Sequence, residues 1–251
     1  MTTVLTEDPC DGVRIVKLNR PHRLNAIVPE LLEDLIAAIH SANRAPEIRA
    51  IVLTGAGRAF CSGDDLKEFA SQSRSDVFAR KYIDRIQDVT RAMVLGDKPV
   101  IGAIHGWAVG GGLEWVINTD FAIAAEATRF FFPEISLGVF VTGGVTELLP
   151  RLVGLQRARE LMMLGERFDT SQAHAWGLVW KVVPGAELMS QAIDLARRLA
   201  ALPQGPVRDL RRILARRTGG GLEAAMSAES EATLRGFLDP ESAKRIAAFG
   251  R

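Results

Sequence analysis

Short apolar stretches alternate with amphipathic helical ones along the first half of this chain. The apolar stretches have the length and composition of buried strands, and they cover residues 13–18, 50–53, 100–104 and 121–124. Between them, apolar side chains recur three and four residues apart at 29–42 and 75–95. Buried strands separated by helices are typical of a mostly parallel sheet. The sequence therefore predicts an α/β fold.

The chain changes character after Pro184, where helical patterns follow one another and no strand is expected. The patterns cover residues 187–201, 206–217 and 221–237, with breaks at Leu202-Pro203 and Thr218-Gly219-Gly220. A helical region of roughly 50 residues is too small to be stable alone. We therefore divide the chain into a core, residues 1–196, and a helical region, residues 197–251, that packs on the core or on a neighbouring subunit.

Charge and composition exclude several classes of protein. Lys plus Arg total 31 and Asp plus Glu total 30 among 251 residues, so no global field favours nucleic acid or an anionic membrane. The sequence has neither an apolar run that could cross a bilayer nor a secretion signal at its start. Its two cysteines and four histidines form no metal-binding motif. We expect a cytoplasmic protein without a metal site.

Other catalytic and nucleotide-binding motifs are incomplete or missing. The segment 55–60 follows a strand but has only two of the three glycines of a dinucleotide-binding turn, and no clear helix follows it. A plain turn is the better interpretation. The chain has no P-loop sequence, and it has no G-x-S-x-G sequence that would expose a nucleophilic serine. A Rossmann-type dinucleotide site, a P-loop site and nucleophilic hydrolysis are therefore disfavoured.

Two glutamates, Glu114 and Glu134, mark the candidate catalytic site. Glu114 follows Gly110-Gly111-Gly112, a strand-to-helix turn whose free backbone N–H groups stabilise a developing negative charge. Glu134 has largely apolar neighbours, which raise a carboxyl pKa by desolvation and suit a group that donates a proton near neutral pH. The alternatives are a helix-start glutamate favoured by the dipole alone and a surface glutamate in a turn.

Four segments, in this order, resemble the motifs of the crotonase (enoyl-CoA hydratase/isomerase) superfamily. They are residues 18–26 (LNRPHRLNA), 54–67 (TGAGRAFCSGDDLK), 106–114 (GWAVGGGLE) and 132–138 (FPEISLG). The resemblance implies a spiral of ββα turns followed by a helical trimerisation region, and hence a homotrimer or homohexamer. We expect the apolar face of this region to be buried between subunits, and that face consists of Leu222, Met226, Leu234 and Phe237.

The resemblance also implies an acyl-CoA thioester as substrate, with coenzyme A as part of the substrate and no further cofactor. The thioester carbonyl would lie in an oxyanion hole between two backbone N–H donors, which fall here on Asp64 and Gly111. Residues along the CoA path would be Arg23, Leu24, Ala26, Asp65, Leu66 and Lys67. The two cations among them supply local positive charge that the nearly neutral chain lacks overall.

Hydratases of the superfamily resemble this chain in carrying both acids, whereas simple enoyl-CoA isomerases typically lack the acid at the position of Glu114. The resemblance therefore implies syn hydration of a trans-2-enoyl-CoA to a 3-hydroxyacyl-CoA in acyl-CoA catabolism. Glu114 would help to deprotonate water for attack on Cβ, and Glu134 would supply the proton at Cα. Two alternatives stay open: another crotonase-type reaction (isomerase, dehydratase or C–C hydrolase) and a non-catalytic CoA-binding or RNA-binding relative.

Two of the departures from the superfamily pattern concern the candidate site. Asp64 places a carboxylate where the residue is often small, and its side chain either faces away or tunes the substrate. The loop at 139–146 reads VFVTGGVT, without the proline that hydratases usually carry and with bulkier side chains. We therefore expect the depth and shape of the acyl pocket to differ from those of other hydratases.

Overall fold

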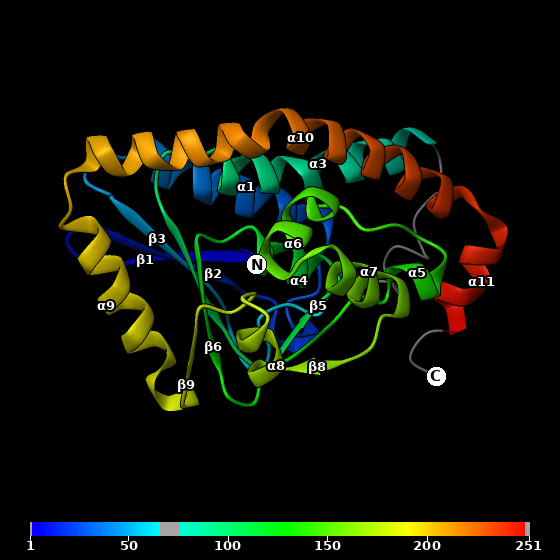
Figure 1. Ribbon diagram of the computed structural model, residues 1–251, viewed down its shortest axis with the longest axis horizontal. Coiled ribbons are helices and arrows are strands. Elements are labelled where there is room, and N and C mark those ends of the chain that lie inside the picture. The colour runs from blue at the N-terminus through cyan, green and yellow to red at the C-terminus, as the bar shows by residue number, and fades with distance from the viewer. Residues whose placement is uncertain (1, 66–75, 249–251) are drawn as a thin grey trace.

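A six-stranded sheet runs through the centre of the molecule (Figure 1). The computed structural model describes residues 2–65 and 76–248. In spatial order the strands are β1 (Val4–Cys10), β2 (Val13–Leu18), β3 (Ala50–Gly55), β4 (Val100–Ile104), β6 (Phe121–Ala125) and β9 (Lys181–Val183). All neighbours pair in parallel except β1 and β2. The predicted α/β fold is confirmed, and β1 is an additional edge strand, a position that tolerates its proline.

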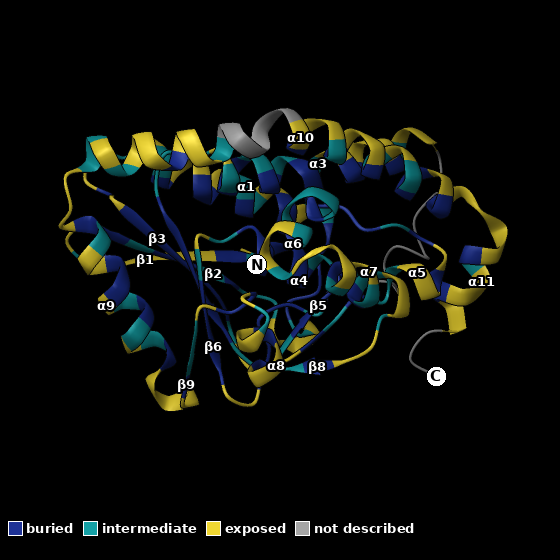
Figure 2. Ribbon diagram, in the orientation of Figure 1, coloured by how far each residue is buried: buried dark blue, intermediate teal, exposed yellow. Residues whose placement is uncertain are grey.

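Helices cover both faces of this sheet. Side chains alternate along each strand, so Val52 and Ile101 pack in the core cluster of α9 (Leu188–Ala200). Ile51 and Leu53 belong to the larger cluster, which contains the apolar faces of α1 (Pro29–Arg44) and α3 (Asp76–Val94). Figure 2 shows the inner strands of the sheet buried and the outer faces of the helices exposed, whereas most of the edge strand β1 is exposed. The helices predicted at 29–42 and 75–95 are confirmed to within two residues.

A second, three-stranded sheet brings the two sequence segments of the candidate site together. Its strands are β5 (Trp107–Val109), β7 (Arg129–Phe131) and β8 (Phe168–Asp169). The short strand β5, which the sequence did not indicate, lies between β4 and the glycine turn. After the turn comes α4 (Gly111–Ile117), and α5 (Glu134–Leu137) follows β7. Because β5 and β7 pair in parallel, both helices begin at the same edge of the sheet.

The C-terminal region folds as one long helix and one short helix, α10 (Gln204–Leu238) and α11 (Pro240–Ala248). The predicted break at Thr218-Gly219-Gly220 is wrong, because α10 continues through it. A helical glycine costs only about 1 kcal/mol, and α10 packs along α3 and α6 (Val145–Val153), which offsets that cost. At Gly221 a Cβ would lie 2.7 Å from a Glu147 oxygen, so glycine lets α10 approach α6.

The apolar face of α10 between residues 222 and 237 is buried within its own chain. The side chains expected between subunits contact the core instead, and they are Leu222, Met226, Leu234 and Phe237. The prediction that neighbouring subunits bury them is therefore wrong. Arg211 anchors the other half of α10, because its Nε donates to the Asp120 carboxylate at 2.9 Å. The predicted division of the chain falls inside α9 and stays a prediction, as do the trimer and the hexamer.

The remaining described helices lie in the connections between these elements. They are α7 (Leu155–Leu164), α8 (Thr170–Ala175) and the 3-10 turns η1 (Pro21–Arg23) and η2 (Gly185–Glu187). No helix within 2–65 and 76–248 is long and apolar enough to cross a bilayer. Over the same residues, no three histidine, cysteine, aspartate or glutamate side chains are grouped so that they could hold a metal ion.

Candidate active site

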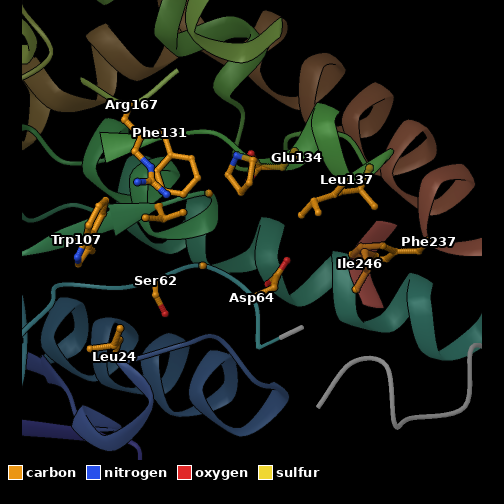
Figure 3. A pocket seen from close by; sticks show the side chains of 15 residues that line it. Leu24, Ser62, Asp64, Trp107, Phe131, Glu134, Leu137, Arg167, Phe237 and Ile246 are labelled. Carbon is orange, nitrogen blue, oxygen red and sulfur yellow. The ribbon is translucent and has the colours of Figure 1, made fainter. Parts of the chain in front are cut away.

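A cavity of about 380 Å³ opens where α4 and α5 begin. One end is aromatic and cationic, and it is lined by Trp107, Phe131 and Arg167 (Figure 3). The other end is apolar and includes Phe237 of α10 and Ile246 of α11. Asp64 and Glu134 lie between the two ends, and the turn glycine Gly110 also lines the cavity. The C-terminal helices of the same chain therefore form part of the cavity wall.

Glu134 begins α5 and lies against the glycine turn. Its Oε2 atom is buried and has no hydrogen-bond partner among the described residues. A Cβ at Gly110 would lie 2.5 Å from Glu134 Oε1, so only glycine leaves room for this carboxyl. Burial, and then the charge of Glu114, raise the pKa of Glu134 well above its ordinary value. Glu134 therefore has the environment of a protonated carboxyl that can donate its proton.

Glu114 lies on α4 and is 1% exposed. Thr142 binds both of its oxygens: the Thr142 N–H donates to Oε1 and the Thr142 hydroxyl donates to Oε2, each at 2.7 Å. Burial raises the pKa of Glu114 to about 8, although the two hydrogen bonds act in the opposite direction. Glu114 is not among the residues that line the cavity. Because the charge of Glu114 acts on Glu134, the two carboxyls titrate as a pair.

The backbone N–H groups of Asp64 and Gly111 donate no hydrogen bond to a described residue. Gly111 is the first residue of α4, where N–H groups lack partners within the helix. A Cβ at Gly111 would meet Ile27 Cδ1 at 2.7 Å, so this glycine makes room for a core side chain. Two free donors are what stabilisation of an oxyanion requires.

Asp64 is among the residues that line the cavity, and the expectation that its side chain tunes the substrate stays a prediction. The Tyr82 hydroxyl donates to its Oδ1 at 2.7 Å. Burial raises the pKa of Asp64 to about 6 in spite of this bond. The candidate site therefore has a third carboxyl besides Glu114 and Glu134, and a tyrosine of α3 holds it.

Of the residues predicted along the CoA path that the structure describes, one lines the cavity and three do not. Leu24 lines the cavity, whereas Arg23 is exposed outside it. Ala26 and Asp65 both bind Arg20: the Ala26 carbonyl accepts from Nη1 at 2.6 Å, and the Asp65 carboxylate accepts at 3.3 Å. Through Arg20, the Ala26 carbonyl and the Asp65 carboxylate join the loops that carry these two residues. Neither residue lines the cavity. The other two predicted positions lie outside the described residues, and they are Leu66 and Lys67.

Reasoning from the sequence missed four side chains at this site. Thr142 and Tyr82 hold two of the carboxyls, and Arg20 joins the loops that carry Ala26 and Asp65. Arg167 lies over Trp107 and Phe131, with its guanidinium carbon 5.5 and 5.2 Å from the two ring centroids. None has a local sequence signal, because each acts through a contact between distant segments.

Residues 9–249 match the family model described as enoyl-CoA hydratase/isomerase. The chain belongs to this family. A mitochondrial enoyl-CoA hydratase of Pongo abelii is 36% identical over 189 residues, which are 75% of this chain and 64% of that protein. The 1,2-epoxyphenylacetyl-CoA isomerase of Escherichia coli (strain K12) is 37% identical over 194 residues, which are 76% of this chain and 74% of that protein.

The fold is also similar to that of a solved member of the family. The crystal structure of an enoyl-CoA hydratase/isomerase from Mycobacterium paratuberculosis matches with a TM-score of 0.93 and 26% identity over 99% of each chain. The crotonase-type fold that the four motifs implied is therefore confirmed. The relatives are named for different reactions, so family membership leaves the reaction to be argued from the site.

Proposed function

We propose that this enoyl-CoA hydratase/isomerase family member hydrates trans-2-enoyl-CoA thioesters to 3-hydroxyacyl-CoA. The coupled pair Glu114 and Glu134 supports the proposal most directly. Burial disfavours the charged form of both carboxyls, and the charge of Glu114 disfavours ionisation of Glu134. One carboxyl can then hold a proton while the other accepts one, as addition of water across a double bond requires.

The thioester carbonyl accepts hydrogen bonds from the free N–H groups of Asp64 and Gly111. Glu114 takes a proton from water, and the water oxygen forms a bond to Cβ. The π electrons of the double bond move toward the carbonyl, where the two donors stabilise the enolate. Glu134 gives its proton to Cα, and transfer of the proton from Glu114 to Glu134 completes the cycle. The sum is one water added to the double bond.

The two ends of the cavity suit the two ends of such a substrate. The acyl chain would lie at the apolar end, against Leu137, Phe237 and Ile246. The thioester would lie beside Asp64 and Gly110, and the chain toward CoA would pass Leu24 at the aromatic end. A cavity of about 380 Å³ is at the small end of the usual range for ligand pockets, so we expect short acyl chains to be preferred.

One observation favours isomerisation as a second candidate. Both oxygens of Glu114 are bound by Thr142, and Glu114 does not line the cavity. If Glu114 is only structural, Glu134 alone would move a proton between Cα and Cγ of a 3-enoyl-CoA. One of the similar relatives is itself named an isomerase.

A panel of 2-enoyl-CoA and 3-enoyl-CoA thioesters of varied length distinguishes the two reactions. Hydration removes the absorbance of the conjugated thioester and yields a 3-hydroxyacyl-CoA, whereas isomerisation of a 3-enoyl-CoA produces that absorbance. We expect the wild type and Glu231→Gln, an exposed control on α10, to hydrate the 2-enoyl-CoAs equally. Isomerisation without any hydroxyacyl product would refute the hydratase proposal.

A further inference from the structure

A further buried glutamate, Glu229 of α10, binds the loop that holds Glu114. Glu229 is 1% exposed and does not line the cavity. Its Oε2 accepts the N–H of Gly144 at 2.9 Å. Its Oε1 accepts the N–H and the hydroxyl of Thr146 at 2.8 and 2.6 Å. These three hydrogen bonds fasten residues 142–146, which we name the acid loop, to the C-terminal helix.

The acid loop is also bound by Glu114 and by Gln87 of α3. Thr142 gives its N–H and its hydroxyl to Glu114, each at 2.7 Å. The N–H of Gly143 donates to Gln87 Oε1 at 3.2 Å. A Cβ at Gly143 would lie 2.9 Å from Glu114 Oε2, so the loop backbone packs directly on the carboxyl. A shift of the acid loop therefore displaces Glu114.

Glu229 takes the place of a helix cap. Gly144 is the N-cap residue of α6, and as a glycine it has no side chain that could accept the first N–H groups of that helix. Glu229, on the neighbouring helix α10, accepts two of these N–H groups, those of Gly144 and Thr146. The start of α6 is therefore held in place by α10. Thr142 lies two residues before Gly144, so the orientation of its hydrogen bonds to Glu114 also depends on α10.

We infer that Glu229 is a positioning residue for the proposed reaction, because it holds the acid loop so that Thr142 keeps the Glu114 carboxyl in place. The inference rests on the proposed function. It extends the site to a residue of the C-terminal region that does not line the cavity. The charge of Glu229 is among the influences that raise the pKa of Glu114, which agrees with this coupling.

The substitution Glu229→Gln tests the inference at nearly constant side-chain volume. One acceptor oxygen becomes an amide NH₂, which cannot accept the N–H groups of Gly144 or Thr146. We expect kcat to fall by about 10²-fold, the usual effect of a catalytic group misplaced by about 1 Å. KM should stay within about 3-fold, because the cavity wall is unchanged. The matched control Glu231→Gln lies two residues further along α10 and should keep the wild-type kcat.

The same substitution in a Glu114→Gln background separates positioning from general stability. If Glu229 acts through Glu114, Glu229→Gln should cause less than about 2-fold further loss, because the two effects share one pathway. A similar fold-loss in both backgrounds would overturn the inference, and so would an unchanged kcat of the folded single variant.

Two further measurements cover failures of folding and of the proposed function. If Glu229→Gln does not fold, Thr146→Val removes only the hydroxyl bond to Glu229, and we expect kcat to fall by about 10-fold. An unchanged kcat would overturn the inference.

If the wild type hydrates no enoyl-CoA, the proposed function fails, and a crystal structure of Glu229→Gln decides instead. We expect the distance from Thr142 N to Glu114 Oε1 to exceed the present 2.7 Å by more than 0.5 Å, and an unchanged distance would overturn the inference.

Discussion

Replacement of Gly110 by alanine tests whether the glycine turn leaves room for Glu134. An added Cβ would lie 2.5 Å from Glu134 Oε1, whereas ordinary van der Waals contact begins at 3.4 Å, so the carboxyl must move by about 0.9 Å. A misplacement of about 1 Å near the reacting atoms costs on the order of 10²-fold in rate. Gly110 also has φ +51°, and a non-glycine residue held in such a conformation costs roughly 1–3 kcal/mol of stability.

We expect folded Gly110→Ala to have a lower Tm and a kcat for enoyl-CoA hydration about 10²-fold lower. The control is Gly154→Ala, because Gly154 has φ +78° but no atom within 4 Å of an added Cβ. This variant should lose stability through its backbone alone and keep the wild-type kcat. If folded Gly110→Ala turns over substrate as fast as Gly154→Ala, the reasoning on Glu134 is refuted.

Three further predictions follow from the pKa values, the acid loop and the exposed helix face. Glu114 has a pKa of about 8 in the folded protein against an ordinary 4.5, so the folded state binds the proton more tightly and stability falls as the pH rises from 4.5 to 8. The Tm should therefore decrease less between pH 5 and pH 8 in Glu114→Gln than in the wild type, and equal decreases would contradict the burial argument. Thr142→Val removes the hydroxyl bond to Glu114 and should lower kcat by about 10-fold or more, with an unchanged KM in steady-state kinetics; wild-type kcat would show that this bond is dispensable. The wild type should run as a trimer or hexamer in light scattering, and Ile213→Lys, on the exposed apolar face of α10, should weaken that assembly; a wild-type monomer at micromolar concentration would refute the oligomer.

Much of the fold could be predicted from the sequence because burial on both faces of a strand shows directly in composition. Residues 50–53 are apolar throughout, and β3 is buried along its whole length. The strand β5 could not be predicted, because three residues are too few for a periodic pattern. The predicted helix break at Gly219 was wrong for a different reason. Glycine does weaken a helix locally, but the packing of α10 on α3 and α6 outweighs that effect.

In the candidate site, too, some residues could be predicted from the sequence and others could not. Glu114, Glu134 and the glycine turn are adjacent to their own helix starts, so local rules could identify them. The contacts that hold them join distant segments: Thr142 reaches Glu114 across 28 positions, and Glu229 reaches Gly144 across 85. No periodicity records such pairs. The family resemblance implied a position along the CoA path for Asp65, and the bond of its side chain to Arg20, 45 positions away, has no local sequence signal either.

Exchange of the α-protons of a saturated acyl-CoA with deuterated water tests the central claim most directly, because it isolates the proton transfer at Cα from the attack of water. Glu134→Gln should abolish both hydration and this exchange. Glu114→Gln should lose hydration by about 10²- to 10⁴-fold, the usual range for general acid–base help, and keep a measurable part of the exchange. An exchange rate in folded Glu134→Gln equal to that of the wild type would contradict the two-carboxyl hydration proposed for this protein.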